Sequence, residues 1–402
     1  MDDKTARILQ TCDELAEKFV GRARKYDSEA SFPVENYADM RELGLMGLMV
    51  PESHGGMGAD FLQYTKAAGR LAQGDSSTAV TFNMHNIIMG TLAEVDENAL
   101  VGRRGKLMAD FRNWAFAEAV AGKVFAASLT EPGVGFHPRL LSTKYKRVDG
   151  GYLLNGKKSF VSLAGNADYY VVAAVADRET TSGNPTVSWL VVSEDDPGVR
   201  IENVWDTLGM RATVSDNLYL EDTFIPDERL FLRTEGLVVQ KLSKEPHLVV
   251  GGFSACYLGI IEATFKFVVE YLSKKTQIGN DAPLTDTQLV QLRVGEMSVQ
   301  VEAARALVYS AAAKVVADRG SKETNAAVHR GKFYVGEMGP HIASQAIRIC
   351  GGSTIAKYLP MERYYRDIRC CGLMPAKSDE CLWYVGKEAL GYDINKASET
   401  YW

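Results

Sequence analysis

The sequence lacks the features that mark several common classes of protein. Its 402 residues contain neither a GxGxxG nor a GxxxxGK[ST] stretch, which argues against a nicotinamide enzyme of the common type and against a P-loop nucleotide hydrolase. The formal net charge is -6, so we expect no nucleic-acid partner. No window approaches the roughly 18 uninterrupted apolar residues of a membrane span, and the first ten residues, MDDKTARILQ, do not resemble a secretory signal. We therefore expect a cytoplasmic protein with no membrane partner.

Cysteine is also scarce, with six residues in the whole chain. None of them forms a CxxC pair, and no His/Cys cluster has the spacing of a zinc site, so we expect no metal. We interpret them as reduced thiols that pack as small hydrophobic side chains. They are Cys12, Cys256, Cys350, Cys370, Cys371 and Cys381.

What is present is an ordinary globular composition arranged in three zones. The chain is 46% hydrophobic and 24% charged, and its length allows two or three domains. Residues 1–123 have a mostly helical pattern with a loop break at 51–58, residues 124–235 have short Val-, Tyr- and Leu-rich runs separated by turn residues, and residues 236–402 are helical again. The sequence therefore predicts an α+β protein with an N-terminal helical domain, a central antiparallel β domain and a C-terminal four-helix bundle. This order excludes a doubly wound fold, in which strands and helices alternate throughout.

The third zone carries the clearest periodicity. One apolar face recurs at spacings of three and four residues, which predicts a long helix. Further helices are expected at about 323–349 and 379–390, and long helices of this kind usually pack as a bundle. The residues of the apolar face are Met297, Val301, Ala304, Val308, Ala311, Ala312 and Val315.

Two segments of the β zone have residue types suited to a ligand. Ser128–Gly135 (SLTEPGVG) ends a strand in a turn whose glycines allow a close backbone approach. Leu154–Asp168 (LNGKKSFVSLAGNAD) places Phe160 two residues before Ser162, an aromatic ring and a hydroxyl that could flank a planar heterocycle. Taken separately, each segment is explained as well by an ordinary turn or hairpin.

Together the two segments resemble the flavin-binding signatures of the acyl-CoA dehydrogenase family, (L/V)TEP-x-x-GSD and NGxKxWIT. The resemblance continues through about 320 residues in the same order. Pro51–Gly58 (PESHGGMG) is similar to the family's P-E-x-x-G-G-x-G loop, and Leu208–Thr213 followed by Tyr219–Pro226 is similar to its GMR…F-x-D-V-x-V-P stretch. Ile349–Gly352 and Glu362–Asp367 resemble its Q-x-x-GG and E-R-x-x-R-D signatures.

The resemblance implies an oxidoreductase that binds FAD, forms a homo-oligomer (a dimer or tetramer) and exchanges electrons with a small-molecule substrate and either an electron-transfer flavoprotein or a flavin reductase. It places the flavin ring between the β domain and the C-terminal bundle. By position, the cofactor-binding residues are Leu129, Thr130, Phe160, Val161, Ser162, Lys275, Gln288, Arg348, Gly351 and Gly352. The substrate-binding residues are His85, Gly135, Phe136 and Val249.

The chain departs from the family pattern where the catalytic base should stand. Most members have a glutamate nine residues after the Arg of the R-D pair, and here that position is Pro375. Other members have it at the start of the first C-terminal helix, and here that position is Val249. Neither side chain can accept a proton, so the catalytic residue is left unassigned. Glu245, Asp379 and Glu380 lie nearby and are candidates, although each is explained better as a solvated or first-turn helix residue.

Three hypotheses follow. The first is a dehydrogenase that oxidises an acyl thioester or a related substrate with a displaced base. The second is a monooxygenase that uses reduced flavin and does not need the glutamate; Phe136, which replaces a serine that helps to bind CoA in the family, weakens the case for a CoA thioester. The third is a non-catalytic relative that keeps the fold for binding, against which the two flavin signatures argue.

Overall fold

The computed structural model describes all residues except 1, 136, 138–139, 179–184 and 393–402. The helices of the N-terminal part are α1 (Asp3–Glu29), α2 (Val34–Glu42), α3 (Phe61–Gly74), α4 (Ser76–Ala93) and α5 (Gly102–Val120). The strands are β1 (Phe125–Ser128), β2 (Lys144–Val148), β3 (Gly151–Val161), β4 (Tyr169–Ala176), β5 (Val187–Ser193), β6 (Val199–Glu202) and β7 (Asp216–Pro226). The C-terminal helices are α6 (Leu237–Lys244), α7 (His247–Leu272), α8 (Gln288–Ala317), α9 (Lys322–Cys350), α10 (Met361–Arg369) and α11 (Ser378–Ala389).

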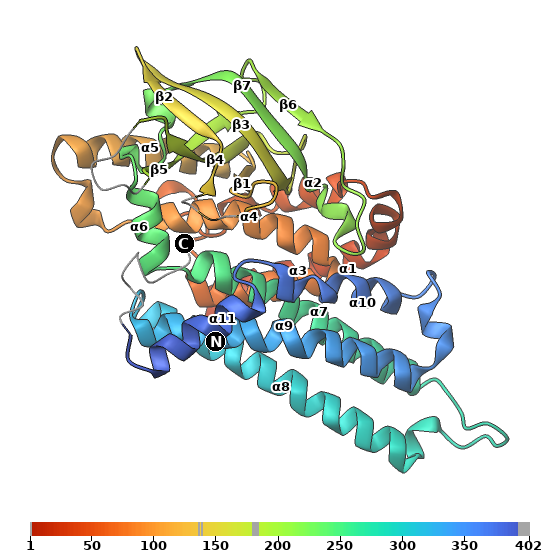
Figure 1. The fold of residues 1–402 in the computed structure, drawn as a ribbon. Coiled ribbons are helices and arrows are strands. Elements are labelled where there is room, and N and C mark those ends of the chain that lie inside the picture. Colours follow the sequence, from red (N-terminus) through yellow and green to blue (C-terminus); the bar gives the residue numbers. More distant parts are fainter. Residues whose placement is uncertain (1, 136, 138–139, 179–184, 393–402) are drawn as a thin grey trace.

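The elements stack in layers, with the sheet over the N-terminal helices and the C-terminal bundle on their other side (Figure 1). Helix α4 lies in the middle, because it packs against β1 on one side and α7 on the other. Its residues are almost all buried, as expected for a helix that is covered all round. Asp75 starts this helix by accepting the N–H of Thr78 with its carboxylate, which satisfies one of the free donors of the first turn.

The sheet has the order β1-β4-β2-β3-β7-β6, with β5 also paired to β4. The expected antiparallel arrangement holds for β2–β3, β3–β7, β6–β7 and β4–β5. It does not hold for β4, which runs parallel to both β1 and β2. The sequence could not indicate this, since β4 inserts between two strands that precede it in the chain, and strand order is set by tertiary packing rather than by local pattern.

The helical predictions for the third zone are confirmed. The seven residues of the predicted apolar face are all buried on α8, and α9 and α11 begin and end within one residue of the expected bounds. One described helix, α7, is long and apolar enough to cross a membrane, but 89% of its apolar window is buried inside the fold. It is the central helix of the bundle, with α8 and α9 packed against it. The six cysteines are free and five are buried, which confirms their interpretation as packed hydrophobic side chains.

Candidate functional site

The two ligand-suited segments of the β zone meet in the structure. The chain leaves β1 at Ser128 and runs alongside β3, where the N–H of Ser159 donates to the carbonyl of Thr130 over 3.0 Å. The hydroxyl of Thr130 returns a hydrogen bond to the carbonyl of Ser159. Leu129 and Thr130 therefore lie beside the end of β3, which carries Phe160 and is followed directly by Ser162, although the pairs are about thirty residues apart in sequence.

Strand β3 is irregular at this point. Its register against β7 shifts between Lys158 and Val161, and Phe160 lies in the left-handed region at φ 55°. A bulky residue adopts that conformation only when the surroundings impose it. The bulge turns the ring of Phe160 outward, so that 64% of the residue is exposed, and the ring of Trp205 packs against it edge-on at 5.8 Å. The structure thus holds an aromatic ring in a fixed position with much of its surface uncovered.

Unpaired polar groups occur in the two segments that meet here. Within the described part of the chain, the main-chain N–H groups of Leu129 and Thr130 have no acceptor. The hydroxyls of Ser128 and Ser159 are buried and have no partner there either. Buried polar groups are nearly always hydrogen-bonded, so a group of unpaired donors is typical of a place that a polar ligand completes. These residues fit the edge of a flavin ring.

A buried ion pair joins the two segments. The ammonium of Lys158 lies 2.7 Å from a carboxylate oxygen of Glu131, and both side chains are almost fully buried. Glu131 also accepts the N–H and hydroxyl of Ser142 and the N–H of Thr143. Although burial opposes ionisation, Lys158 and these donors together lower the pKa of Glu131 to about 2. Both residues lie within the two signatures, and no role was predicted for them from the sequence. A signal was present, because one signature carries an acidic residue and the other a basic residue.

The site is tied to the helices through Asp367, at the end of the E-R-x-x-R-D signature. One oxygen of this carboxylate accepts the N–H of Met210 over 2.6 Å, and the other accepts the hydroxyl of Ser76 over 2.5 Å. The guanidinium of Arg363 approaches to 4.0 Å. Complete burial raises the pKa of Asp367 to about 6, because these contacts only partly replace its hydration. Sequence reasoning missed this residue as well.

The other five residues assigned to the cofactor by resemblance lie on the C-terminal helices and the loops that join them. The ammonium of Lys275 stands 4.8 Å over the ring of Tyr271, whose hydroxyl bonds Ser353 over 2.6 Å, next to Gly351 and Gly352. Lys275 and the Gly351–Gly352 turn are thereby brought together. Gln288 at the start of α8 and Arg348 near the end of α9 are both exposed. Their roles as cofactor ligands stay predictions.

The residues expected to contact substrate have different surroundings. His85 is fully buried, with one ring nitrogen 2.8 Å from the carbonyl of Met46 and the other accepting the N–H of Phe125 over 3.1 Å. Burial lowers its pKa to about 4. Both ring nitrogens are thus hydrogen-bonded to main-chain groups. In this geometry His85 holds two main-chain segments together and has no nitrogen free for a substrate. Val249 is buried in α7, Gly135 pairs with Glu131 at φ 62°, and Phe136 lies outside the described residues.

Two of the three candidate bases are already engaged. Glu245 ends α6 and is paired with Lys241 at 2.7 Å and with Arg319 at 3.2 Å. Glu380 accepts the N–H of Lys377 over 2.8 Å and so caps the start of α11, as its first-turn interpretation required. Asp379 is exposed in the same turn. None of these contacts points to an activated general base.

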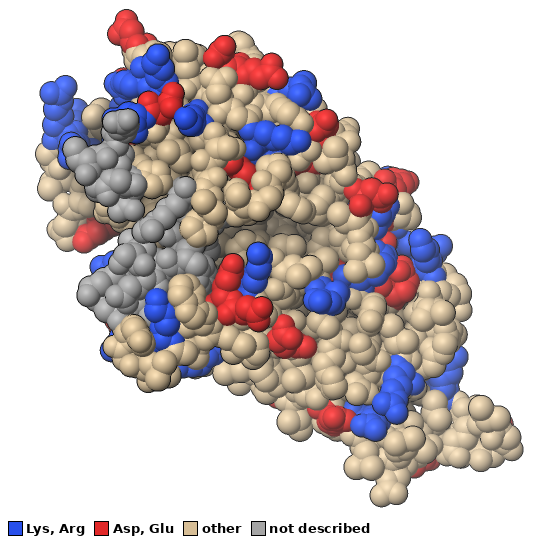
Figure 2. All heavy atoms as spheres, in the orientation of Figure 1, with Lys and Arg blue, Asp and Glu red and all other residues tan. Residues whose placement is uncertain are grey.

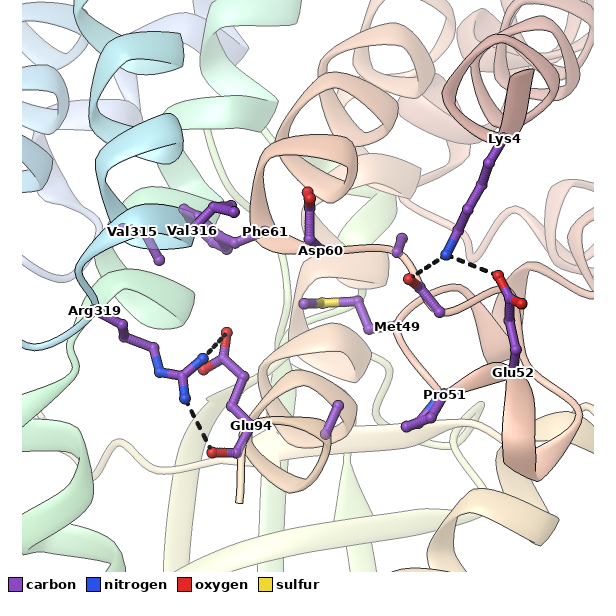
Figure 3. A pocket seen from close by; sticks show the side chains of 13 residues that line it. Lys4, Met49, Pro51, Glu52, Asp60, Phe61, Glu94, Val315, Val316 and Arg319 are labelled. Carbon is purple, nitrogen blue, oxygen red and sulfur yellow. Dashed lines mark hydrogen bonds and ion pairs between the residues drawn. The ribbon is translucent and has the colours of Figure 1, made fainter. Parts of the chain in front are cut away.

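A cavity of about 400 Å³ lies elsewhere, between the Pro51–Gly58 loop and the C-terminal end of α8 (Figure 3). Its floor is apolar, with Met49 and Phe61. At its rim Lys4 pairs with Glu52 at 2.9 Å, and Arg319 pairs with Glu94 at 3.6 Å. None of the residues that resemble flavin ligands lines it. The remaining carboxylate of the lining, Asp60, accepts the N–H of Gln63 and caps α3.

The visible face of the molecule is hollowed between the β layer and the C-terminal helices (Figure 2). Acidic and basic side chains are interspersed over this face, and neither sign forms a continuous patch there. The hollow lies between the layers where the resemblance places the flavin ring.

Comparison with known proteins identifies the class. The models of the acyl-CoA dehydrogenase N-terminal, middle and C-terminal domains match residues 2–95, 126–223 and 251–374. The chain belongs to the acyl-CoA dehydrogenase family and is a flavin-dependent oxidoreductase.

Among its relatives is the mitochondrial short-chain specific acyl-CoA dehydrogenase of Rattus norvegicus, 30% identical over 92% of this chain and 86% of the relative. Butyryl-CoA dehydrogenase from Megasphaera elsdenii has the same fold, with a TM-score of 0.85 at 24% identity over 97% of this chain and 99% of that one. The fold is also that of the methanesulfinate monooxygenase MsuC from Pseudomonas fluorescens, with a TM-score of 0.82 at 24% identity over 95% and 96% of the two chains.

Proposed function

We propose that the chain binds FAD, with the flavin ring against the exposed face of Phe160 and the unpaired N–H groups of Leu129 and Thr130. The observation that supports this is the combination of a ring held outward at a strained bulge and unsatisfied donors beside it. Ser162 contacts the reactive edge of the ring. The flavin, when bound, supplies the acceptor for a hydride; the protein supplies position and polarity.

The reaction that we propose is the oxidation of an acyl thioester. Support comes from the 30% identity to a short-chain specific acyl-CoA dehydrogenase over most of both chains. Removing the α proton of a thioester needs a base that is placed close to it and held away from water. Since Pro375 and Val249 occupy the two family positions of that base, another group must take the proton, and the catalytic residue stays unassigned.

A monooxygenase that uses reduced flavin is the second candidate. It is favoured by the same observation, because a chain with no carboxylate at position 375 or 249 has lost the group that only the dehydrogenase reaction requires. In this case the electron partner is a flavin reductase, whereas the dehydrogenase passes its electrons to an electron-transfer flavoprotein.

Anaerobic titration of the flavin-loaded protein with a series of acyl-CoAs tests the proposal. Bleaching of the oxidised flavin band by the wild-type protein supports the dehydrogenase and shows that a base exists. Absence of bleaching, together with oxygen-dependent product formation when a reductase supplies electrons, overturns it in favour of the monooxygenase. A protein that binds no flavin in either redox state contradicts both candidates.

The Pro375→Glu variant makes this test sharper. If only the base is missing, a glutamate at position 375 gives thioester-dependent bleaching that the wild-type protein lacks. Leu373→Glu is the matched control. Leu373 lies two residues away and is 60% exposed, so a glutamate at that position carries the same charge in solvent. Bleaching by both variants would show that the position of the new carboxylate does not matter.

We also propose that the chain forms a homo-oligomer through α8. Large apolar side chains are exposed along this helix and in the loop before it, including Ile278, Leu289, Leu292 and Val299. Exposed apolar groups of this kind favour burial against another chain. A Leu289→Glu/Leu292→Glu variant is expected to have the mass of a monomer by light scattering. An unchanged mass would show that α8 is not the interface.

A further inference from the structure

A row of buried hydroxyls leads away from Ser162. The hydroxyl oxygen of Ser162 lies 2.8 Å from that of Ser215, which lies 2.7 Å from that of Thr213. The hydroxyl of Thr213 in turn lies 2.8 Å from the carbonyl oxygen of Met210. Each separation is that of an O–H···O hydrogen bond, and all three hydroxyl-bearing residues are buried.

The number of protons fixes the direction of this row. Each hydroxyl has one hydrogen to donate and two lone pairs to accept with, and a carbonyl oxygen can only accept. There are three short oxygen–oxygen contacts and three hydroxyl hydrogens. Each contact needs one hydrogen, so Thr213 donates to Met210, Ser215 donates to Thr213, and Ser162 donates to Ser215. If each hydroxyl donated in the opposite direction, no hydrogen would lie between the hydroxyl of Thr213 and the carbonyl of Met210. The lone pairs of these two oxygens would then face each other.

The carbonyl at the end of the row is held in place. It also accepts the indole N–H of Trp205 over 3.0 Å, and the N–H of Met210 is bound by the buried carboxylate of Asp367. Trp205 is the residue that packs edge-on against Phe160. The direction of the row is therefore anchored to the framework that positions the aromatic ring of the site.

We propose that Thr213 and Ser215 are positioning residues that present the oxygen of Ser162 to the flavin as a hydrogen-bond acceptor only. This inference rests on the proposed flavin site. Reduced flavin carries a hydrogen on N5, whereas oxidised flavin has a lone pair there. An acceptor at that atom binds the reduced form and repels the oxidised form. The row thus raises the affinity for reduced flavin relative to oxidised flavin, whichever of the two reactions the protein carries out.

The ratio of the dissociation constants for oxidised and reduced FAD, measured anaerobically, tests this inference. In Ser215→Ala and Thr213→Val the hydrogen of Ser162 becomes free to turn toward N5, so the ratio is expected to fall by about tenfold, the effect of one hydrogen bond. For a two-electron couple this lowers the midpoint potential of the bound flavin by about 30 mV. Thr213→Ser keeps the hydroxyl and is expected to remain within about twofold of the wild type.

Thr223→Val is the matched control, because Thr223 is a buried hydroxyl of β7 with no described partner and no place in the row. The inference is overturned if Ser215→Ala and Thr213→Val shift the ratio no more than Thr223→Val does, or if they raise it. A wild-type protein that binds neither form of flavin contradicts the proposed function instead. If Ser215→Ala does not fold, the comparison of Thr213→Val with Thr213→Ser decides the question.

Discussion

The ion pair between Glu131 and Lys158 allows a quantitative test of how the site is held together. The two charges are 2.7 Å apart, with 1% and 0% of their side chains exposed. At an effective dielectric constant of 20, which suits buried sites in proteins, their gross attraction is about 6 kcal/mol. Much of this is offset by the loss of hydration of both groups.

Removing one partner leaves the other charge buried without compensation, which typically costs about 3 to 5 kcal/mol. We therefore expect Lys158→Met and Glu131→Gln each to lower the free energy of unfolding by that amount. The double variant leaves no buried charge, so its loss should fall short of the sum of the two single losses by at least about 2 kcal/mol. The same reasoning predicts an effect of pH. The lowered pKa of Glu131 stabilises the fold above its ordinary pKa near 4.5, and this contribution is lost as the pH falls through the lowered value.

Urea denaturation of the wild-type protein and the three variants, followed by circular dichroism and by flavin release, measures these losses. Lys157→Met is the control, since Lys157 directly precedes Lys158 in the same strand. Its pair with Glu202 is exposed, so the free energy of unfolding should change little. Additive losses in the double variant would refute the reasoning, because they would mean that the two charges do not stabilise each other. Loss of stability with full retention of flavin affinity would show that the pair does not shape the flavin edge.

Other predictions follow from the described packing. His329 is fully buried and its pKa is lowered to about 4, so His329 alone should account for a loss of about 2 kcal/mol of stability between pH 7 and pH 5, where the unfolded chain takes up the proton first. His329→Phe should remove that share of the difference between denaturation at the two pH values. Gly252→Ala places a Cβ atom 2.0 Å from the amide oxygen of Asn83 and should cost about 2 to 3 kcal/mol, whereas Gly21→Ala, with open space, should not destabilise. Glu245→Gln should leave thioester-dependent flavin reduction unchanged, and loss of that reduction would identify the base.

Periodic features of the chain were predictable from the sequence. The apolar face of α8 needed no tertiary information, because spacings of three and four residues define one side of a helix. The turns between strands were equally visible. The parallel pairing of β4 with β1 and β2 was not, since local patterns specify strands but not their neighbours.

The site was predictable only in part. The two flavin signatures gave the position of the aromatic ring at Phe160 and of the hydroxyl at Ser162. They did not predict the bulge that turns the ring outward, because no sequence pattern indicates a phenylalanine with a positive φ. Nor did they give the partners of Ser162, since Ser215 lies 53 residues further along and the two meet only through the register of β3 against β7. His85 shows the converse case, in which a residue type suited to chemistry is used to bond two main-chain groups.

The family signatures in this chain supply contacts that hold its layers together. Asp367, in the last of them, joins Ser76 of α4 and Met210 of the β domain to α10, and a glycine at position 209 is required because a Cβ there would lie 2.4 Å from the carbonyl oxygen of Arg366. These contacts hold the layers and the flavin edge in register whatever reaction follows. None of these contacts involves Pro375. It follows that the signatures predict fold and cofactor more securely than substrate.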